Sequence, residues 1–223
     1  PLRYRTALIA FLISCAVLVG GGMALGGSIH MMALFFLLFF LYSMAIARMR
    51  AELGPPAHDL HALGPEVLLS NAVGTANVRT GDMAAFSLFF WFNRAYRAHF
   101  SAHSMEGLKL AQLKRVSSRS MMLAIAVAVI VGIFSAYWAI LHALYVHGYS
   151  GRPAGQAFAQ EAWTRMEGWV SFPENSRVAA TMATGIGLVF TLFLGWMRSG
   201  FTWWAWHPVG YATATSWSMS KLW

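Results

Sequence analysis

The sequence has few charged residues and almost no cysteine. Charged side chains make up 11% of its 223 residues and hydrophobic ones 58%, whereas soluble domains carry about 25% charged residues. Its one cysteine, Cys15, excludes an intrachain disulfide framework and a metal site built from thiolates. The chain also lacks a glycine-rich phosphate loop, a nucleophile elbow and a cofactor fingerprint. These absences exclude a soluble domain and the common nucleotide-binding and hydrolase classes.

Long apolar runs are what the sequence has instead. Four segments contain no Asp, Glu, Lys or Arg and have the roughly 20 residues needed to cross a hydrocarbon core; they are residues 6–27, 29–47, 121–142 and 178–197. Runs of this length without alternation predict helices rather than barrel strands. The first run is too long for a signal-peptide core, so we interpret it as a retained helix. We therefore predict an all-α integral membrane protein with four transmembrane helices in two pairs.

Four regions follow from these runs. Residues 1–47 form a first helix pair with a tight turn at Gly26, Gly27 and Ser28. Residues 48–120 form a long cytoplasmic loop with short interfacial or re-entrant helices. Residues 121–204 form a second pair around an outer loop at 148–176, and residues 205–223 form an interfacial or re-entrant segment. Because the chain begins at Pro1 rather than Met, we expect a processed product or a portion of a longer protein.

The basic residues predict the orientation in the membrane. Nine of the sixteen Lys and Arg residues fall within 48–119, Arg3 and Arg5 precede the first helix, and Arg198 follows the fourth. The positive-inside rule places all of them on the cytoplasmic side, with both termini inside, and we assign the chain to the bacterial cytoplasmic membrane. Topology and anionic lipid explain the net charge of +8. The lipid bilayer, and not nucleic acid, is the expected partner.

A short aromatic run at residues 83–92 stands out in the predicted loop. Ten residues cannot cross a membrane, so we predict a re-entrant half-helix or a buried interfacial helix. Asn93, Arg94 and Arg97 follow it, and they either anchor the chain to headgroups or line a path for an anionic substrate, since Arg presents a fixed fork to carboxylate or phosphate. The hypothesis of a substrate-lining surface comprises Arg48, Arg50, Glu52, Asn93, Arg94, Arg97 and His207.

Two histidine pairs in the same stretch are weak metal-ligand candidates. His58 and His61 are three residues apart, and His99 and His103 are four apart, with Glu106 on the same helical face. The residue after His99 is phenylalanine, so the HExxH motif of zinc proteases is absent. An amphipathic surface helix is the favoured interpretation. We predict no cofactor and no catalytic residue, leave a bound metal or pigment open, and favour a protein that is not an enzyme.

Three longer motifs suggest a family. The stretches RMRAELGPPAHDLHALGPE, FFWFNRAYRAHFSAHSMEGLKL and WHPVGYATATSWSMSKLW resemble a bacterial family of polytopic membrane proteins of unassigned function. Members are sometimes labelled as similar to oligopeptide transporters. The resemblance covers most of the chain, mainly residues 40–120 and 196–223. It implies that the chain is a portion, or a shortened relative, of a protein with many more helices.

Three functions remain open at this level. A transporter-like or transporter-derived protein would move peptides or small anions by alternating access around discontinuous helices. A structural or accessory subunit would use its many Trp, Phe and Met side chains to contact other membrane subunits, a missing chain portion or a second copy. A membrane metal enzyme would use the ligands named above.

Overall fold

The computed structural model describes residues 4–54, 64–90, 99–148 and 154–214, and every regular element in these ranges is a helix. The elements are α1 (Tyr4–Ala24), α2 (Ile29–Leu53), α3 (Pro65–Val73), the single 3₁₀ turn η2 (Thr75–Asn77), α4 (Thr80–Leu88), α6 (Phe100–Leu113), α7 (Ser118–His147), α8 (Ala154–Ser171), α9 (Val178–Gly200) and α10 (Pro208–Ala214).

Four of these helices are long and apolar enough to cross a membrane, namely α1, α2, α7 and α9. This confirms the predicted all-helical membrane-type fold. Three of the helices, α2, α7 and α9, extend past the apolar runs that predicted them, α9 by three residues to Gly200. α2 continues to Leu53 and stops at Gly54, whose left-handed backbone lets its N–H bond to the Arg50 carbonyl at 2.9 Å. α7 begins at Ser118 because the Ser117 hydroxyl accepts a hydrogen bond from the Ser120 amide at 3.1 Å.

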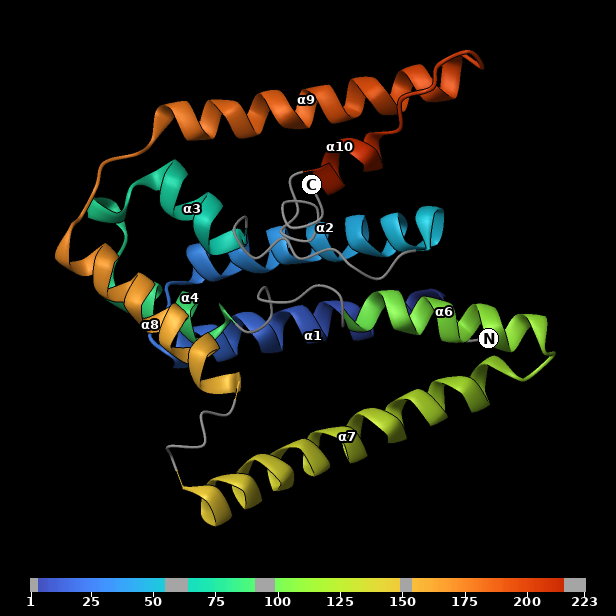
Figure 1. The fold of residues 1–223 in the computed structure, drawn as a ribbon, viewed down its shortest axis with the longest axis horizontal. Helices are drawn as coiled ribbons and strands as arrows, with labels where there is room; N and C mark the ends of the chain where they lie inside the picture. The colour runs from blue at the N-terminus through green and yellow to red at the C-terminus, as the bar shows by residue number, and fades with distance from the viewer. Residues whose placement is uncertain (1–3, 55–63, 91–98, 149–153, 215–223) are drawn as a thin grey trace.

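Helices α1 and α2 form an antiparallel hairpin through the middle of the molecule (Figure 1). Gly26 makes the turn possible with φ of +97°, a backbone conformation that side chains other than glycine rarely adopt. We call the end of the molecule that holds residues 25–28 the turn end. The opposite end, where Arg48 and Arg50 lie in the last turns of α2, is the arginine end.

The other two long helices do not form a second pair. α7 packs on α6, and α9 packs on α3 and α10, so α7 and α9 lie on opposite sides of the α1–α2 hairpin (Figure 1). The predicted pairing assumed that helices close in sequence pack together. Here α8 and the segment after it separate the two helices along the chain, and α9 is held instead by the Arg177 amide, which donates to the Asn71 carbonyl of α3 at 2.9 Å.

The stretch between α2 and α7 reaches the turn end. Asp82, in the first turn of α4, accepts hydrogen bonds from the Ser28 amide at 2.5 Å and from the Ser28 hydroxyl at 2.8 Å. One turn further on, the ring of Phe86 stacks on that of Phe35 in α2, with centroids 5.5 Å apart. α4 therefore starts beside the α1–α2 turn and runs in the same direction as α2.

The same stretch then continues along α2 to the arginine end. In α6, the Ser101 hydroxyl accepts a hydrogen bond from the Ser43 hydroxyl at 3.1 Å, and Glu106 pairs with Arg50. The described residues 82–90 and 99–106 thus lie beside α2 at points between Ser28 and Arg50, which are about 33 Å apart at 1.5 Å per helical residue. This matches the thickness of a hydrocarbon core, about 30 Å.

The buried core lies at the turn end, where α2, α3 and α4 meet. Its fully or nearly buried members are Met31, Met32, Phe35, Phe36, Leu69, Val78, Met83, Ala85 and Phe86. Three of these, Met83, Ala85 and Phe86, come from the aromatic run that we predicted to be re-entrant or interfacial, and they pack against protein. The prediction of a loop on one side of the membrane differs from this arrangement, because residues 64–90 pack at the turn end while Arg48 and Arg50 lie at the other.

Close backbone contact at Gly81 provides a test of this packing. A methyl group on Gly81 would lie against the Gly26 carbonyl oxygen, which is backbone and cannot move aside alone. We expect Gly81→Ala to destabilise the fold by about 1–3 kcal/mol. Gly132→Ala, in α7, meets nothing within 4 Å and should leave the melting temperature unchanged or slightly raised. Equal effects of the two substitutions on the melting temperature in one detergent would contradict the contact.

Candidate functional site between helices α2, α9 and α10

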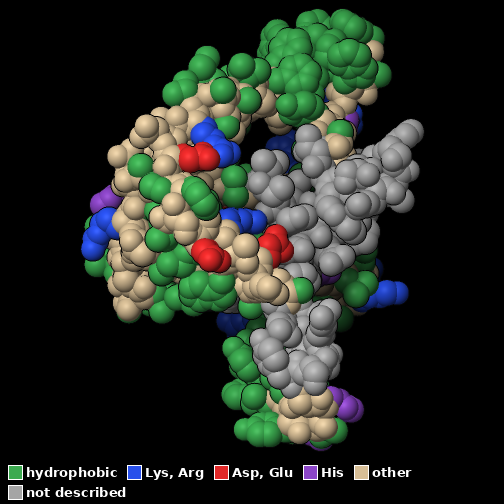
Figure 2. Space-filling view, turned by 60° about the vertical axis from the view of Figure 1, so that its left-hand side comes forward, with side chains coloured by type: hydrophobic (Ala, Val, Ile, Leu, Met, Phe, Trp, Pro, Cys, Tyr) green, Lys and Arg blue, Asp and Glu red, His purple; other side chains and the backbone are tan. Residues whose placement is uncertain are grey.

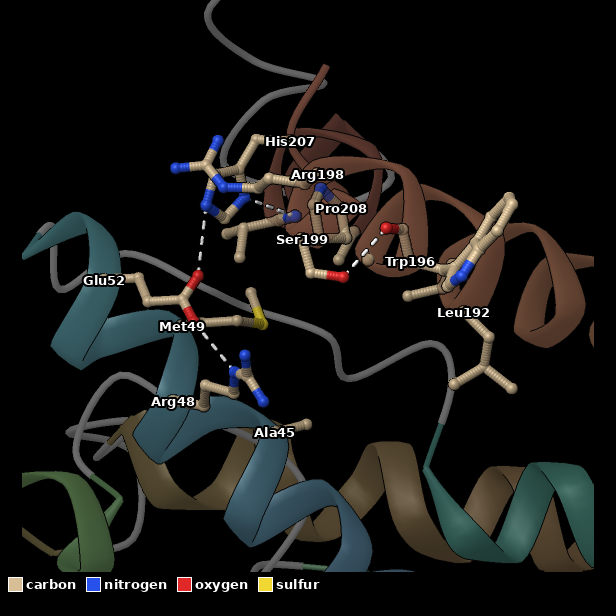
Figure 3. A pocket seen from close by; sticks show the side chains of 14 residues that line it. Ala45, Arg48, Met49, Glu52, Leu192, Trp196, Arg198, Ser199, His207 and Pro208 are labelled. Carbon is tan, nitrogen blue, oxygen red and sulfur yellow. Dashed lines mark hydrogen bonds and ion pairs between the residues drawn. The ribbon is translucent and has the colours of Figure 1, made fainter. Parts of the chain in front are cut away.

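A pocket of about 900 Å³ lies at the arginine end between α2, α9 and α10 (Figure 3). Each of the three helices contributes to its wall. The lining residues are Ala45, Arg48, Met49, Glu52, Thr191, Leu192, Gly195, Trp196, Arg198, Ser199, His207, Pro208, Val209 and Ala212. The wall is mostly apolar, and four ionisable side chains are gathered in it. Small-molecule sites commonly have this composition, with a few polar groups in an apolar cleft.

Glu52 joins α2 to the segment that leads into α10. Its Oε1 accepts a hydrogen bond from Arg48 Nε at 2.8 Å, and its Oε2 lies 3.1 Å from His207 Nε2 (Figure 3). Arg48 and Glu52 are one helical turn apart on α2, so they share a face. His207 comes from a point 155 positions later in the chain, and only the folded chain brings it to this carboxylate.

The hydrogen bonds of His207 define its tautomer. His207 precedes α10, and its Nδ1 accepts a hydrogen bond from the Val209 amide at 3.0 Å. A ring nitrogen that accepts carries no proton, so the proton of the neutral ring is on Nε2 and points to Glu52. His207 therefore acts as an N-cap for α10 while donating to α2. A proton on Nδ1 would remove this acceptor and the cap with it.

Two substitutions of His207 separate these roles. His207→Ala removes both the cap and the bond to Glu52, and we expect α10 to lose about 1 kcal/mol of local stability. His207→Asn keeps a side-chain oxygen able to accept from the Val209 amide, so it should retain most of the cap. Hydrogen exchange of the peptide covering α10, measured by mass spectrometry, should be faster in the alanine variant only. Equally fast exchange in both variants would rule out the capping role.

Arg198 is the second arginine of the pocket. It lies in the last turn of α9, and within the described part of the chain it forms no ion pair. Figure 3 shows its guanidinium beside His207, above Glu52. Arg48 uses Nε for Glu52, and its side chain is 81% exposed, so its terminal nitrogens also face open space. Two guanidinium groups thus line the same pocket, and of the two only Arg48 bonds to Glu52 within the described residues.

An aromatic cluster folds the chain back to form the third wall. After α9 ends, the rings of Phe201, Trp203, Trp204 and Trp206 pack edge to face or tilted, each on the next, with centroids 5.4–5.8 Å apart. The ring of Tyr211 then reaches Phe190, about three turns back along α9, at 5.1 Å. α10 therefore runs back along α9. Our prediction of an interfacial or re-entrant segment at 205–223 concerns partly this helix and partly residues 215–223, which lie outside the described ranges.

The pocket contains only some of the predicted substrate-lining residues. Arg48, Glu52 and His207 meet there. Arg50 is on a different face of α2, where it pairs with Glu106. The remaining three, Asn93, Arg94 and Arg97, lie outside the described residues.

Sequence reasoning missed Arg198 and Trp196 as members of this surface. We treated Arg198 only as a basic residue at the membrane interface, and the tryptophans that follow α9 as an interfacial belt. Trp196 and Arg198 both lie in the last turns of α9, and both line the pocket. One signal in the sequence could have indicated this surface. A single Arg ends an apolar run that is otherwise uncharged, and a Pro at which the chain turns back lies close to it.

The predicted metal ligands do not converge in the described residues. There, no group of three or more His, Cys, Asp or Glu side chains could hold a metal ion. His103 Nδ1 lies 3.5 Å from Glu106 Oε2, while His99 Nδ1 is 2.9 Å from the Ser101 hydroxyl. The hydrogen bond from Arg50 holds the pKa of the Glu106 carboxyl below its usual value. His58 and His61 lie outside the described ranges.

A second polar cluster lies at the turn end. Glu66 of α3 is 1% exposed and accepts a hydrogen bond from Arg165 of α8 at 3.1 Å, and the Arg165 guanidinium lies 4.7 Å from the centre of the Phe90 ring. Nearby, the Thr75 hydroxyl accepts from the Glu174 amide at 2.8 Å. Figure 2 shows acidic and basic side chains side by side on this face. The cluster borders a cavity of about 510 Å³ and ties α8 to α3.

Comparison with known proteins gives a family and no activity. The model of a family of unknown function, DUF6785, matches residues 1–223. No curated protein and no solved structure matches the chain.

Proposed function

We propose that this chain, which belongs to the DUF6785 family of unknown function, is a transporter-like membrane protein for small anions or peptides. The observation that carries the proposal is the set of interrupted helices packed among the four long apolar ones. α3, η2 and α4 meet at the turn end, and α10 folds back along α9. Secondary transporters build their sites from such discontinuous helices.

The surroundings of the interrupted helices support this interpretation. In a bilayer, non-helical backbone is tolerated only where it is buried in protein or faces a water-filled cavity. The break between α3 and α4 meets this condition, because the Ala76 amide donates to the Glu174 carbonyl at 3.0 Å and Val78 is in the core. Residues 82–90 and 99–106, which lie beside α2 at points about a membrane thickness apart, then belong to an additional, interrupted crossing.

The distribution of charge supports an orientation. The arginine end carries basic residues in excess, among them Arg48, Arg50, Lys109, Lys114, Arg115, Arg119 and Arg198. Among the described residues, the turn end has three arginines with five acidic residues, namely Arg79, Arg165 and Arg177 with Glu66, Asp82, Glu161, Glu167 and Glu174. By the positive-inside rule, the arginine end faces the cytoplasm of a bacterial cell, with the N-terminus of α1 and α10 on the same side.

A flux assay tests the proposed activity. The purified chain is reconstituted into liposomes, and uptake of labelled organic anions and of short peptides is followed with and without an imposed proton gradient. We expect saturable uptake of at least one of these solutes, well above that of protein-free liposomes. Uptake equal to the protein-free rate for every solute, from a monodisperse preparation, would overturn the proposal.

An accessory role in a larger membrane complex is the alternative, and α7 favours it. This helix of 30 residues has no buried residue and packs mainly on α6, with apolar side chains on all of its faces. Either a partner helix or lipid would cover the apolar faces of α7. Purification from native membranes with a photo-crosslinker at Phe134, which is 72% exposed, distinguishes the two roles. A crosslinked subunit at fixed stoichiometry supports the accessory role, and crosslinks to lipid alone contradict it.

A further inference from the structure

The pocket at the arginine end carries a net positive charge. Arg48 and Arg198 contribute two positive charges, and Glu52 contributes one negative charge. His207 adds none, because its Nδ1 accepts from the Val209 amide and the ring is neutral. The balance is one positive charge beside a largely apolar wall, and both guanidinium groups are exposed and so accessible to a ligand. A ligand that carries a single negative charge would neutralise it.

The geometry of the two arginines is suited to an oxyanion. Glu52 already accepts from Arg48 Nε and from His207 Nε2, so among the described residues the terminal nitrogens of Arg48 and the guanidinium of Arg198 remain as donors at the pocket. A guanidinium presents parallel N–H groups that match the two oxygens of a carboxylate.

The rest of the wall is suited to an organic group. Met49, Leu192, Trp196 and Val209 contribute apolar side chains to the wall. Figure 3 shows Leu192 and Trp196 on the side of the pocket away from Glu52. The volume of about 900 Å³ is far larger than an inorganic anion requires and falls within the range of about 300–1,000 Å³ seen for organic ligands. An aromatic side chain such as Trp196 also offers a flat contact surface.

We propose that this pocket binds a small organic monoanion, with its carboxylate held by Arg198 and Arg48 and its apolar part against Leu192 and Trp196. The inference rests on the proposed function, for which it supplies the substrate class. A dianion would leave a negative charge in the pocket, and an amine would face two arginines. A zwitterionic peptide would leave the positive charge of the pocket uncompensated.

Calorimetric titration of the purified chain in phosphatidylcholine nanodiscs tests the proposal. The probes are hexanoate, succinate, hexylamine and dialanine. We expect hexanoate to bind with the highest affinity, and Arg198→Gln to weaken its binding by at least about tenfold, since the lost bond is charge-assisted. Arg198→Lys should retain part of the affinity. The matched control is Arg119→Gln, the same change at the same end of the molecule but outside the pocket, which should bind hexanoate as the unmodified chain does.

Several results would overturn the site. One is equal binding of hexanoate and hexylamine, and another is unchanged hexanoate affinity in both Arg198→Gln and Arg48→Gln. A third is tighter binding of dialanine than of hexanoate. A fourth is competitive loss of hexanoate binding as phosphatidylglycerol is added to the nanodiscs, which would identify an anionic lipid headgroup as the occupant. Each variant is first checked for a monodisperse elution profile and an unchanged melting temperature.

The experiments can contradict the proposed binding site and the proposed transport activity independently of each other. If hexanoate binds as expected but liposomes show no uptake, the binding site stands and the transporter role falls. If uptake is saturable but insensitive to Arg198→Gln, transport stands and this pocket is not its substrate site.

Discussion

Replacing Arg165 by methionine is expected to destabilise the fold by about 3 kcal/mol, the lower end of the effect of breaking a buried ion pair. Arg165 is 23% exposed, but its partner Glu66 is only 2% exposed at the side chain, and the two lie 3.1 Å apart. Methionine keeps much of the contact with Phe90 and removes the charge. The buried carboxylate of Glu66 then loses its opposite charge from α8. Unfolding by SDS titration from dodecyl maltoside micelles measures the change.

Two further variants make this prediction specific. Arg177→Met removes the arginine of an exposed pair with Glu174 at the same end of the molecule, and it should have little effect because water screens both groups. The double variant Arg165→Met, Glu66→Leu should recover most of the lost stability, since no buried charge remains without its partner. An additive double variant would show that the pair is not coupled.

The second large effect is expected at Asp82. Its carboxylate accepts from both the amide and the hydroxyl of Ser28 and is 1% exposed. Asp82→Ala should destabilise the fold by about 3 kcal/mol, because two buried donors lose a charged acceptor and bonds to charged groups contribute about 1.5–3 kcal/mol each. Part of this loss is offset, because the alanine variant no longer has to bury a charged carboxylate. The melting temperature and hydrogen exchange of the α1–α2 turn report the loss.

Two more conservative substitutions at the hydrogen bonds between Asp82 and Ser28 serve as comparisons for Asp82→Ala. Asp82→Asn keeps one acceptor oxygen and should lose less stability than Asp82→Ala. Ser28→Ala removes only the hydroxyl donor and should have the smallest effect of the three. If Asp82→Ala leaves exchange at residues 25–28 unchanged, the carboxylate does not hold α4 to the turn.

The sequence predicted those features that depend on local order. The uncharged runs at 6–27, 29–47, 121–142 and 178–197 correspond to α1, α2, α7 and α9, because a bilayer core requires about 20 apolar residues in succession. The turn at Gly26, Gly27 and Ser28 follows from glycine at a position with positive φ. The extra turns of α2 and α7 were not predicted, because a helix can extend past the apolar run through charged residues with good helix propensity.

The sequence predicted three of the four ionisable side chains of the pocket, without showing that they meet. Arg48 and Glu52 are one turn apart on a single helix, so periodicity alone places them on one face. His207 was named from its position beside a Pro-Gly break, without its partner. Arg198 was missed as a pocket residue because nothing in its local sequence separates an interfacial arginine from one that faces another helix.

The order of the amino acids by itself determined that this chain is helical, apolar and built around long membrane-type segments. It also marked where short helices interrupt that pattern. Only the tertiary structure decided that α4 starts beside Ser28 while α6 reaches Arg50, that α7 and α9 lie apart, and that Arg198 and His207 join Arg48 and Glu52. Helix formation depends on neighbours three or four residues away, whereas these contacts depend on which distant side chains can satisfy a buried carboxylate or fill a gap between helices.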